Sequence, residues 1–248
     1  MNKIAICILV MIPFSYKGFH SCSNKPVYDQ VRAVHVISNL PVVGRDSSIT
    51  EVNTYYDVFY YRNFIMYSFL YRFDSIVNGK RLLRENRKYF FVFRKDSLFG
   101  YVYYPKLDHT MPEGRLSVDS VLTSSSYESD VYDSLLHFKP DSSYYNTEKN
   151  LVRVYHHPPK KGDPENYNLS LYYTSKLEGI KETFSKKLDN VKNMKLFRIR
   201  LLADEAYHEE YKMTLPKREI LLEMKEIPVE NQEQVLSYFN EYKKRLSN

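Results

Sequence analysis

The chain has 248 residues, of which 43% are hydrophobic and 27% charged, so it can form a sizeable core and is not wholly disordered. It holds 7 glycines, 2 cysteines and no tryptophan, but 24 tyrosines. The glycine spacing excludes dinucleotide-binding and P-loop motifs, and two cysteines exclude a disulfide scaffold. The formal net charge is +6, to which Lys3 and Lys17 of an expected leader contribute.

The N-terminus has the pattern of a signal peptide over residues 1–21. Lys3 provides a positive start, and Ile4 to Phe14 is an apolar run without a charge. A membrane-spanning helix needs about 20 such residues, so this run has the length of a signal-peptide core. A buried N-terminal strand or helix is the alternative, but the order of basic start, apolar run and small-residue exit favours a signal peptide.

Cys22 decides which export route is expected. Residues 19–22 (Phe-His-Ser-Cys) resemble a bacterial lipobox, in which a small residue precedes the cysteine that receives the lipid. The first two of these residues are bulkier than usual, and secretion by cleavage after Ser23 is the alternative. Because Cys7 lies inside the leader, Cys22 would be the one cysteine of the mature chain. This pattern favours lipid attachment at Cys22, followed by a linker over residues 22–30.

Four Asp-Ser pairs are followed by an aliphatic residue, which resembles the O-glycosylation motif of exported Bacteroidota proteins. The serine carries the glycan in that motif, so the candidate sites are Ser75, Ser97, Ser120 and Ser134. Asp-Ser is also ordinary turn and capping chemistry, because both side chains bond to nearby backbone. Together with the leader and the tyrosine-rich strands, these pairs make the chain resemble exported lipoproteins of Bacteroidota. Lys25 stands where surface-displayed members carry acidic residues, which implies an outer-membrane lipoprotein facing the periplasm.

Residues 31–248 are expected to form a single domain rich in antiparallel strands. Apolar and aromatic runs predict strands at residues 31–37, 55–61, 65–73, 88–93, 98–104, 116–122, 151–156, 169–173, 194–202, 209–213 and 218–224. Asn78-Gly79 is a hairpin signal, and the polar residues 94–97 predict another tight turn. Residues 157–165, rich in proline, predict a flexible loop within the domain.

Two helices are predicted from capping boxes. Ser125 and Glu128 have capping-box spacing ahead of an apolar stripe that ends at Phe138. Ser175 and Glu178 repeat that spacing. The apolar residues that would then share one helical face are Ile180, Phe184, Leu188 and Val191.

A third, amphipathic helix is predicted from about Asn231 to the C-terminus. Its basic last turn, residues 243–245, suits the negative end of the helix dipole. Strands in series with tight turns and about three helices predict an α+β fold, built mainly on an antiparallel sheet that could be curved or a half-barrel. The absence of strand-helix-strand alternation argues against a doubly wound parallel sheet.

Catalytic and metal-binding motifs yield no predicted site, so no catalytic residue, metal or cofactor is expected. Glu205 and His208 have the E-x-x-H spacing of di-iron bundles, but the second copy and the long helices are missing. The acidic residues around them are expected to be solvated. His156 and His157 are neighbours on a predicted strand and point to opposite faces, so they cannot easily share one metal.

The sequence is compatible with three functions. The first is an outer-membrane-anchored lipoprotein acting as a non-enzymatic binding or assembly subunit, with a membrane contact through its N-terminal lipid and a protein partner in the cell envelope. The second is a periplasmic carrier or sensor, which needs a connected apolar cavity. The third is a glycan-active hydrolase, which needs two carboxylates about 5 to 10 Å apart across a cleft. Export argues against nucleic acid as a partner, and a soluble secreted or periplasmic protein is the alternative to an anchored one.

Overall fold

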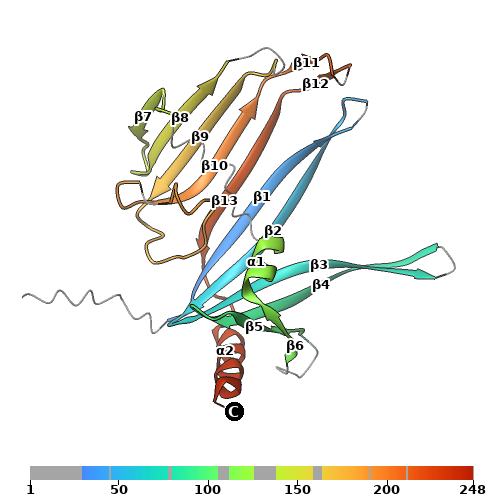
Figure 1. The fold of residues 1–248 in the computed structure, drawn as a ribbon, viewed down its shortest axis with the longest axis vertical. Helices are drawn as coiled ribbons and strands as arrows, with labels where there is room; N and C mark the ends of the chain where they lie inside the picture. The colour runs from blue at the N-terminus through green and yellow to red at the C-terminus, as the bar shows by residue number, and fades with distance from the viewer. Residues whose placement is uncertain are drawn as a thin grey trace, which may run out of the picture.

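The computed structural model describes residues 30–44, 46–77, 80–105, 112–125, 138–158, 164–189, 191–210 and 212–247. Side chains at 71–87, 112–113 and 124–125 lie outside this description. The described chain forms an 11-stranded antiparallel sheet, a separate two-stranded hairpin and two helices (Figure 1). The predicted antiparallel sheet is confirmed.

The first part of the sheet is a meander, in which each strand pairs with the next one along the chain. Its strands are β1 (Arg32–Val43), β2 (Ile49–Tyr61), β3 (Phe64–Val77), β4 (Lys80–Arg94), β5 (Phe99–Tyr103) and β6 (Pro112–Ser117). The predicted turn at residues 94–97 joins β4 to β5, where Ser97 N donates to the Arg94 carbonyl at 2.9 Å. Residues 78 and 79, the other hairpin signal, lie outside the described residues.

The second part of the sheet adds five strands. They are β7 (Ser142–Tyr145), β8 (Leu151–His157), β9 (Tyr167–Thr174), β10 (Lys195–Ala203) and β13 (Arg218–Ile227). β13 pairs with β10 on one side and with β1 on the other, where Val36 faces Met224, so it joins the two parts. The strand order runs from β6 at one edge to β7 at the other, and the sheet is not closed into a barrel. The small hairpin of β11 (Ala206–His208) and β12 (Met213–Leu215) stands between β10 and β13 in the chain.

The C-terminal helix is confirmed as α2 (Gln232–Leu246). The side chain of Asn231 caps it by accepting a 3.0 Å hydrogen bond from Gln234 N, which satisfies one backbone donor of the first turn. The other helix, α1 (Val118–Ser125), occupies part of the segment predicted as strand 116–122. The predicted helix over 125–138 falls largely on residues 126–137, outside the described residues.

The helix predicted over residues 175–191 is wrong, because this segment forms a series of turns. Gly179 has a φ of 80°, which ends any right-handed helix there. The Thr183 and Ser185 hydroxyls accept hydrogen bonds from Ser185 N and Leu188 N, which offers the backbone an alternative to the helical ladder. Two helices, rather than about three, are therefore present among the described residues.

The strand predicted at residues 209–213 is also wrong in most of its length. Residues 209, 210 and 212 form the turn between β11 and β12, and Lys212 N donates to the Glu209 carbonyl at 3.3 Å. The run of charged residues there is turn chemistry, and strand β12 begins only at Met213.

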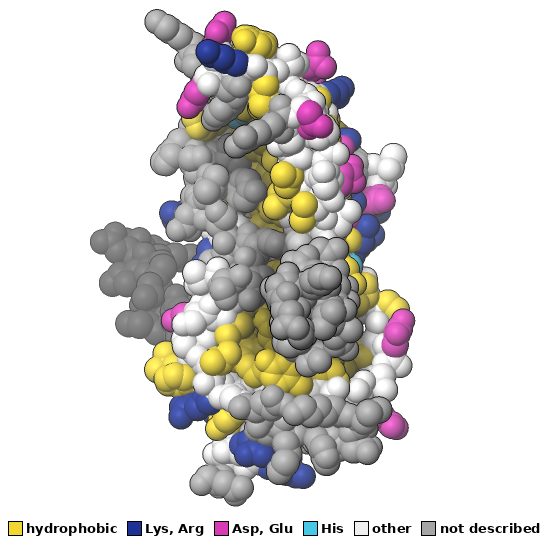
Figure 2. Space-filling model, turned by 90° about the vertical axis from the view of Figure 1, so that its right-hand side faces the viewer, with side chains coloured by type: hydrophobic (Ala, Val, Ile, Leu, Met, Phe, Trp, Pro, Cys, Tyr) yellow, Lys and Arg dark blue, Asp and Glu magenta, His cyan; other side chains and the backbone are white. Residues whose placement is uncertain are grey.

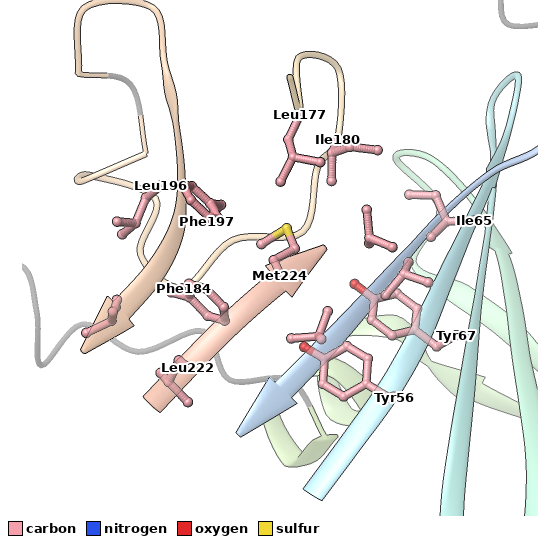
Figure 3. Packing of buried hydrophobic residues seen from close by; sticks show 14 of the residues in the cluster. Tyr56, Ile65, Tyr67, Leu177, Ile180, Phe184, Leu196, Phe197, Leu222 and Met224 are labelled. Atoms are coloured by element: carbon pink, nitrogen blue, oxygen red, sulfur yellow. The ribbon is translucent and has the colours of Figure 1, made fainter. Parts of the chain in front are cut away.

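The sheet buries apolar side chains on both faces, with the alternation expected of strands. One face, called the segment face, is covered by residues 175–189 and 191–194, the covering segment, and by α1. The covering segment contributes Leu177, Ile180, Phe184 and Leu188, each at most 5% exposed. Figure 3 shows Leu177, Ile180 and Phe184 beside Leu222 and Met224 of β13. The apolar spacing that suggested a helix therefore serves to fill this face.

The other face, called the helix face, packs against α2. Met66, Phe90 and Val92 of the sheet form one buried cluster with Val235, Tyr238, Phe239 and Tyr242 of the helix. Phe90 and Tyr238 have ring centroids 4.7 Å apart. Val31 joins the same cluster, so the chain enters the fold beside α2.

Candidate functional site

Most of the site residues predicted from the sequence lie far from one another or fall outside the described residues. Cys22 and Ser134 lie outside the described residues, and Ser75 lies in β3 with its side chain outside them. Ser97 lies in the β4–β5 turn, where its hydroxyl donates to the Phe99 carbonyl at 2.8 Å. Ser120 is exposed on α1, which starts beside that turn because Val118 N donates to the Leu98 carbonyl. Glycosylation of the four serines stays a prediction.

The E-x-x-H histidine takes part in a buried ion cluster. His208 Nε2 lies 2.7 Å from Glu165 Oε1, and Arg218 Nη2 donates to both oxygens of that carboxylate at 2.7 and 2.5 Å. The Glu165 side chain is 1% exposed. Burial by itself raises the pKa of Glu165, but hydrogen bonds from Arg218, Tyr167 and His208 outweigh it and hold that pKa below its usual value.

This Glu165 cluster ties together three parts of the chain that are distant in sequence. Glu165 precedes β9, His208 ends β11 and Arg218 begins β13. Glu205, Glu209 and Glu210 of the expected solvated acidic patch are exposed, whereas Asp204 is half-buried and accepts a 2.7 Å hydrogen bond from Asn166 Nδ2. No group of three or more His, Cys, Asp or Glu side chains suited to a metal occurs among the described residues. The contacts of Glu165 with His208 and Arg218 hold these three parts of the chain together.

A second buried carboxylate, Glu182, fixes the covering segment to the sheet. The hydroxyls of Tyr56 and Tyr67 both donate to its carboxylate, and Glu182 N donates to the Tyr60 hydroxyl at 3.1 Å. Burial, and then repulsion by the Glu182 charge, raise the pKa of Tyr60 and Tyr67 well above the usual value, so both phenols keep their protons. Figure 3 shows Tyr56 and Tyr67 on the face that the segment covers. The alternating tyrosines of β2 were a visible signal, but Glu182 as their partner was not.

The two histidines at the end of β8 are separated, as the strand period requires. His156 Nδ1 lies 3.1 Å from Asn168 Oδ1, whereas the His157 ring contacts Phe138 at 5.9 Å. Their different partners agree with the expectation that the pair does not act together.

The far part of the β1–β2 hairpin carries apolar side chains that are open to solvent. Leu40 and Val52 are cross-strand partners, and Val42 follows on the same face. With Ile49 on the opposite face, these four residues are called the apolar hairpin, and their exposed fractions run from 40% to 53%. In the pairing of the described strands, β13 reaches β1 only as far as Asn39, and β3 reaches β2 only as far as Tyr56. The hairpin therefore projects beyond the sheet, as Figure 1 shows.

The apolar hairpin is held in a defined position. Its turn is closed by Gly44 N donating to the Ser48 carbonyl at 2.8 Å and by Asp46 Oδ1, which accepts from Ser48 N and Oγ. The Ser47 hydroxyl donates to the Thr214 carbonyl of β12 at 2.9 Å. Pro41 has no N–H, so its nitrogen has to face away from β2, toward the free edge of β1. That edge therefore lacks one hydrogen-bond donor and is poorly suited to adding another strand. The exposed faces of the hairpin are better suited to contact than its edge.

No family model, curated protein or solved structure matches this chain. Among the described residues, neither helix has the length and apolar content needed to cross a membrane.

Proposed function

We propose that the chain is an exported lipoprotein, anchored in the outer membrane and facing the periplasm, that acts as a non-enzymatic binding or assembly subunit. The lipobox-like residues ending at Cys22 support the anchor. The linker expected over residues 22–30 would join that cysteine to the sheet. Soluble secretion stays the alternative to the anchor.

The apolar hairpin is the observation that carries the binding role. Large exposed apolar side chains that lie together and in a fixed geometry are typical of protein interaction sites. Here they stand on a projecting element whose turn is braced by Thr214, so little conformational entropy is lost when a partner binds. A protein of the cell envelope with an apolar groove or face is the partner that this surface suits.

The two other functions depend on features that the described residues do not favour. A carrier needs an apolar cavity, whereas the described part of the segment face is filled by Leu177, Ile180, Phe184 and Leu188. A hydrolase needs two facing carboxylates, whereas Glu165 is bound by Arg218 and Glu182 by tyrosines. Both stay alternatives to the binding role.

The anchor is tested at the mature N-terminus. We expect mass spectrometry of the protein from its native cells to find a diacylated or triacylated Cys22. Cys22→Ser should abolish the lipid and allow high salt to extract the protein from membranes, whereas Cys7→Ser should change neither the lipid nor the salt-resistant attachment, because Cys7 lies in the leader. An unmodified N-terminus at Asn24 would instead establish simple secretion.

The binding role is tested by site-specific photo-crosslinking in those cells. A crosslinker at Val42 is expected to give a discrete protein adduct, and one at Lys192, an exposed turn position in the covering segment, is expected to give none. Val52→Asp should remove most of the Val42 adduct, since losing an anchor side chain in a protein interface costs about 2 kcal/mol or more. Equal adducts at Val42 and Lys192 would reject the hairpin as the binding surface.

A further inference from the structure

The end of the molecule where α2 terminates combines exposed apolar side chains with a cluster of cations. The apolar members are Leu98, Phe99, Leu116 and Leu246, with exposed fractions of 75%, 42%, 46% and 48%. The basic members are Arg62, Arg94, Lys95, Arg115, Lys243, Lys244 and Arg245. These residues together are called the basic end. Figure 2 shows dark blue Lys and Arg side chains beside yellow apolar ones in the lower part of the molecule.

Hydrogen bonds and one cation-ring contact hold the parts of the basic end together. The Tyr242 hydroxyl near the end of α2 accepts from Arg94 N at 3.2 Å, and Lys95 N donates to the Asn63 carbonyl at 2.7 Å. These bonds join α2, the β4–β5 turn and the β2–β3 turn. The Arg115 guanidinium lies over the Phe99 ring at 4.3 Å, which brings β6 into the same group.

The acidic residues at this end only partly offset the cations. Glu241 Oε1 pairs with Arg245 Nε at 3.2 Å, and Asp96 and Asp119 are exposed nearby. Lys243 and Lys244 are both exposed, and they stand at the negative end of the helix dipole. The basic end therefore keeps an excess of positive charge.

A hollow of about 650 Å³ lies at the end of α2 and is lined by Asn240, Lys243, Lys244 and Ser247. Its lining provides two lysines and the Asn240 amide, while the Ser247 hydroxyl already donates to the Lys243 carbonyl at 3.3 Å. This donor set suits an anionic group that offers several oxygen acceptors, such as a phosphate diester.

We propose that the basic end is a membrane-docking face that binds anionic phospholipid headgroups. The inference rests on the proposed lipid anchor at Cys22, because the tether has to reach the same plane. Gln30 lies eight positions after Cys22, and a chain of eight residue steps spans at most about 28 Å. Val31 packs in the cluster that holds Val235, and from Val235 to the end of α2 is about 17 Å along the helix. The tether is long enough to let the basic end lie on the membrane.

The two kinds of side chain act together on a bilayer. Cations near an anionic surface contribute about 1 kcal/mol each, and exposed Leu and Phe insert into the boundary between headgroups and acyl chains. The lipid at Cys22 holds the chain at the membrane but leaves the domain free to turn on its linker, so the electrostatic contact orients the domain on the surface. With the basic end down, the apolar hairpin lies toward the opposite end of the molecule, where a partner can reach it (Figure 1).

The test measures binding of the full chain carrying Cys22→Ser, which removes lipidation, to phosphatidylcholine vesicles with and without phosphatidylglycerol. Co-sedimentation is expected to increase with phosphatidylglycerol and to fall as salt is raised. Lys243→Glu/Lys244→Glu is expected to weaken binding to the anionic vesicles by about tenfold or more. Leu98→Ser should weaken it less, because one apolar side chain is lost and no charge changes.

The matched control is Lys212→Glu/Lys217→Glu, which makes the same charge change at the other end of the molecule, next to β12. This control should bind vesicles as well as the parent does. The leader is present in all variants, so the leader does not contribute to any difference between them. Equal losses in the two double variants would reject the docking face in favour of net charge. Inorganic phosphate that binds the parent at the same lysines, without vesicle binding, would reject it in favour of a free-phosphate site. The vesicle result does not depend on lipidation, so it separates this inference from a failure of the Cys22 anchor.

Discussion

Replacing Glu165 with glutamine is expected to lower the free energy of unfolding at pH 7 by about 3 kcal/mol, because it leaves the Arg218 guanidinium buried without its counter-charge. The Glu165 side chain is 1% exposed and Arg218 15% exposed, so water replaces little of the lost interaction. Equilibrium unfolding in urea at pH 7 measures the difference. The matched control is Glu219→Gln, which breaks the Arg200 pair, whose side chains are 42% and 41% exposed. An exposed pair is worth at most about 1 kcal/mol.

The difference in the free energy of unfolding between the parent and Glu165→Gln should depend on pH. Burial opposes its charge, but hydrogen bonds from Arg218, Tyr167 and His208 keep the pKa of Glu165 below its usual 4.5. A depressed carboxyl pKa contributes stability above the unfolded pKa and loses it as pH falls through the folded value. The gap between parent and Glu165→Gln should thus persist from pH 7 to about pH 5 and close in stronger acid. A gap that stayed constant into strong acid would contradict this account.

Replacing Phe184 with alanine is expected to cost about 3 to 5 kcal/mol, because it empties a position at the centre of the covering segment. Phe184 is 1% exposed and packs in the cluster that holds the segment on the sheet. Thermal or denaturant unfolding measures the loss. Backbone amides of residues 175–189 should also exchange hydrogen faster in the variant than in the parent. In the variant, the hydrogen bonds of Glu182 hold the segment on the sheet with less help from apolar packing.

Phe138→Ala provides the control for this second result. Phe138 is 53% exposed and contacts the His157 ring at its edge, so its truncation is expected to cost less than about 1 kcal/mol. Similar losses for the two phenylalanines would mean that the covering segment adds little to stability, and that it could leave the segment face easily. That outcome would favour the carrier alternative over the assembly role.

The buried tyrosines show how far a sequence pattern reaches. Tyr56 and Tyr60 are four residues apart on one strand and so share a face, which period-two alternation predicts. Both side chains are buried on the segment face, whereas Tyr55 on the opposite face is 49% exposed. Nothing local indicated that Glu182, which is 126 residues from Tyr56, would accept hydrogen bonds from Tyr56 and Tyr67.

The candidate sites also divide into those that a local sequence pattern reveals and those that depend on the fold. The lipobox-like pattern at Cys22 and the Asp-Ser motifs are local and can be recognised directly in the sequence. The apolar hairpin could not be, because Leu40 and Val42 are typical core residues, and their exposure follows only from β13 ending its pairing at Asn39. The basic end likewise depends on four turns and strand ends meeting at the end of α2.

By itself, the sequence determined most of the antiparallel strands and the amphipathic α2, because alternation, turn residues and a cap at Asn231 act within a few residues of one another. Tertiary structure decided the rest. It turned the apolar spacing of residues 177–188 into a covering segment, since filling the segment face and burying Glu182 against tyrosines outweighed a local helical tendency. It also brought Glu165 to His208 and Arg218, 43 and 53 residues away, because ion pairs between distant residues form only after the strands that carry them have paired.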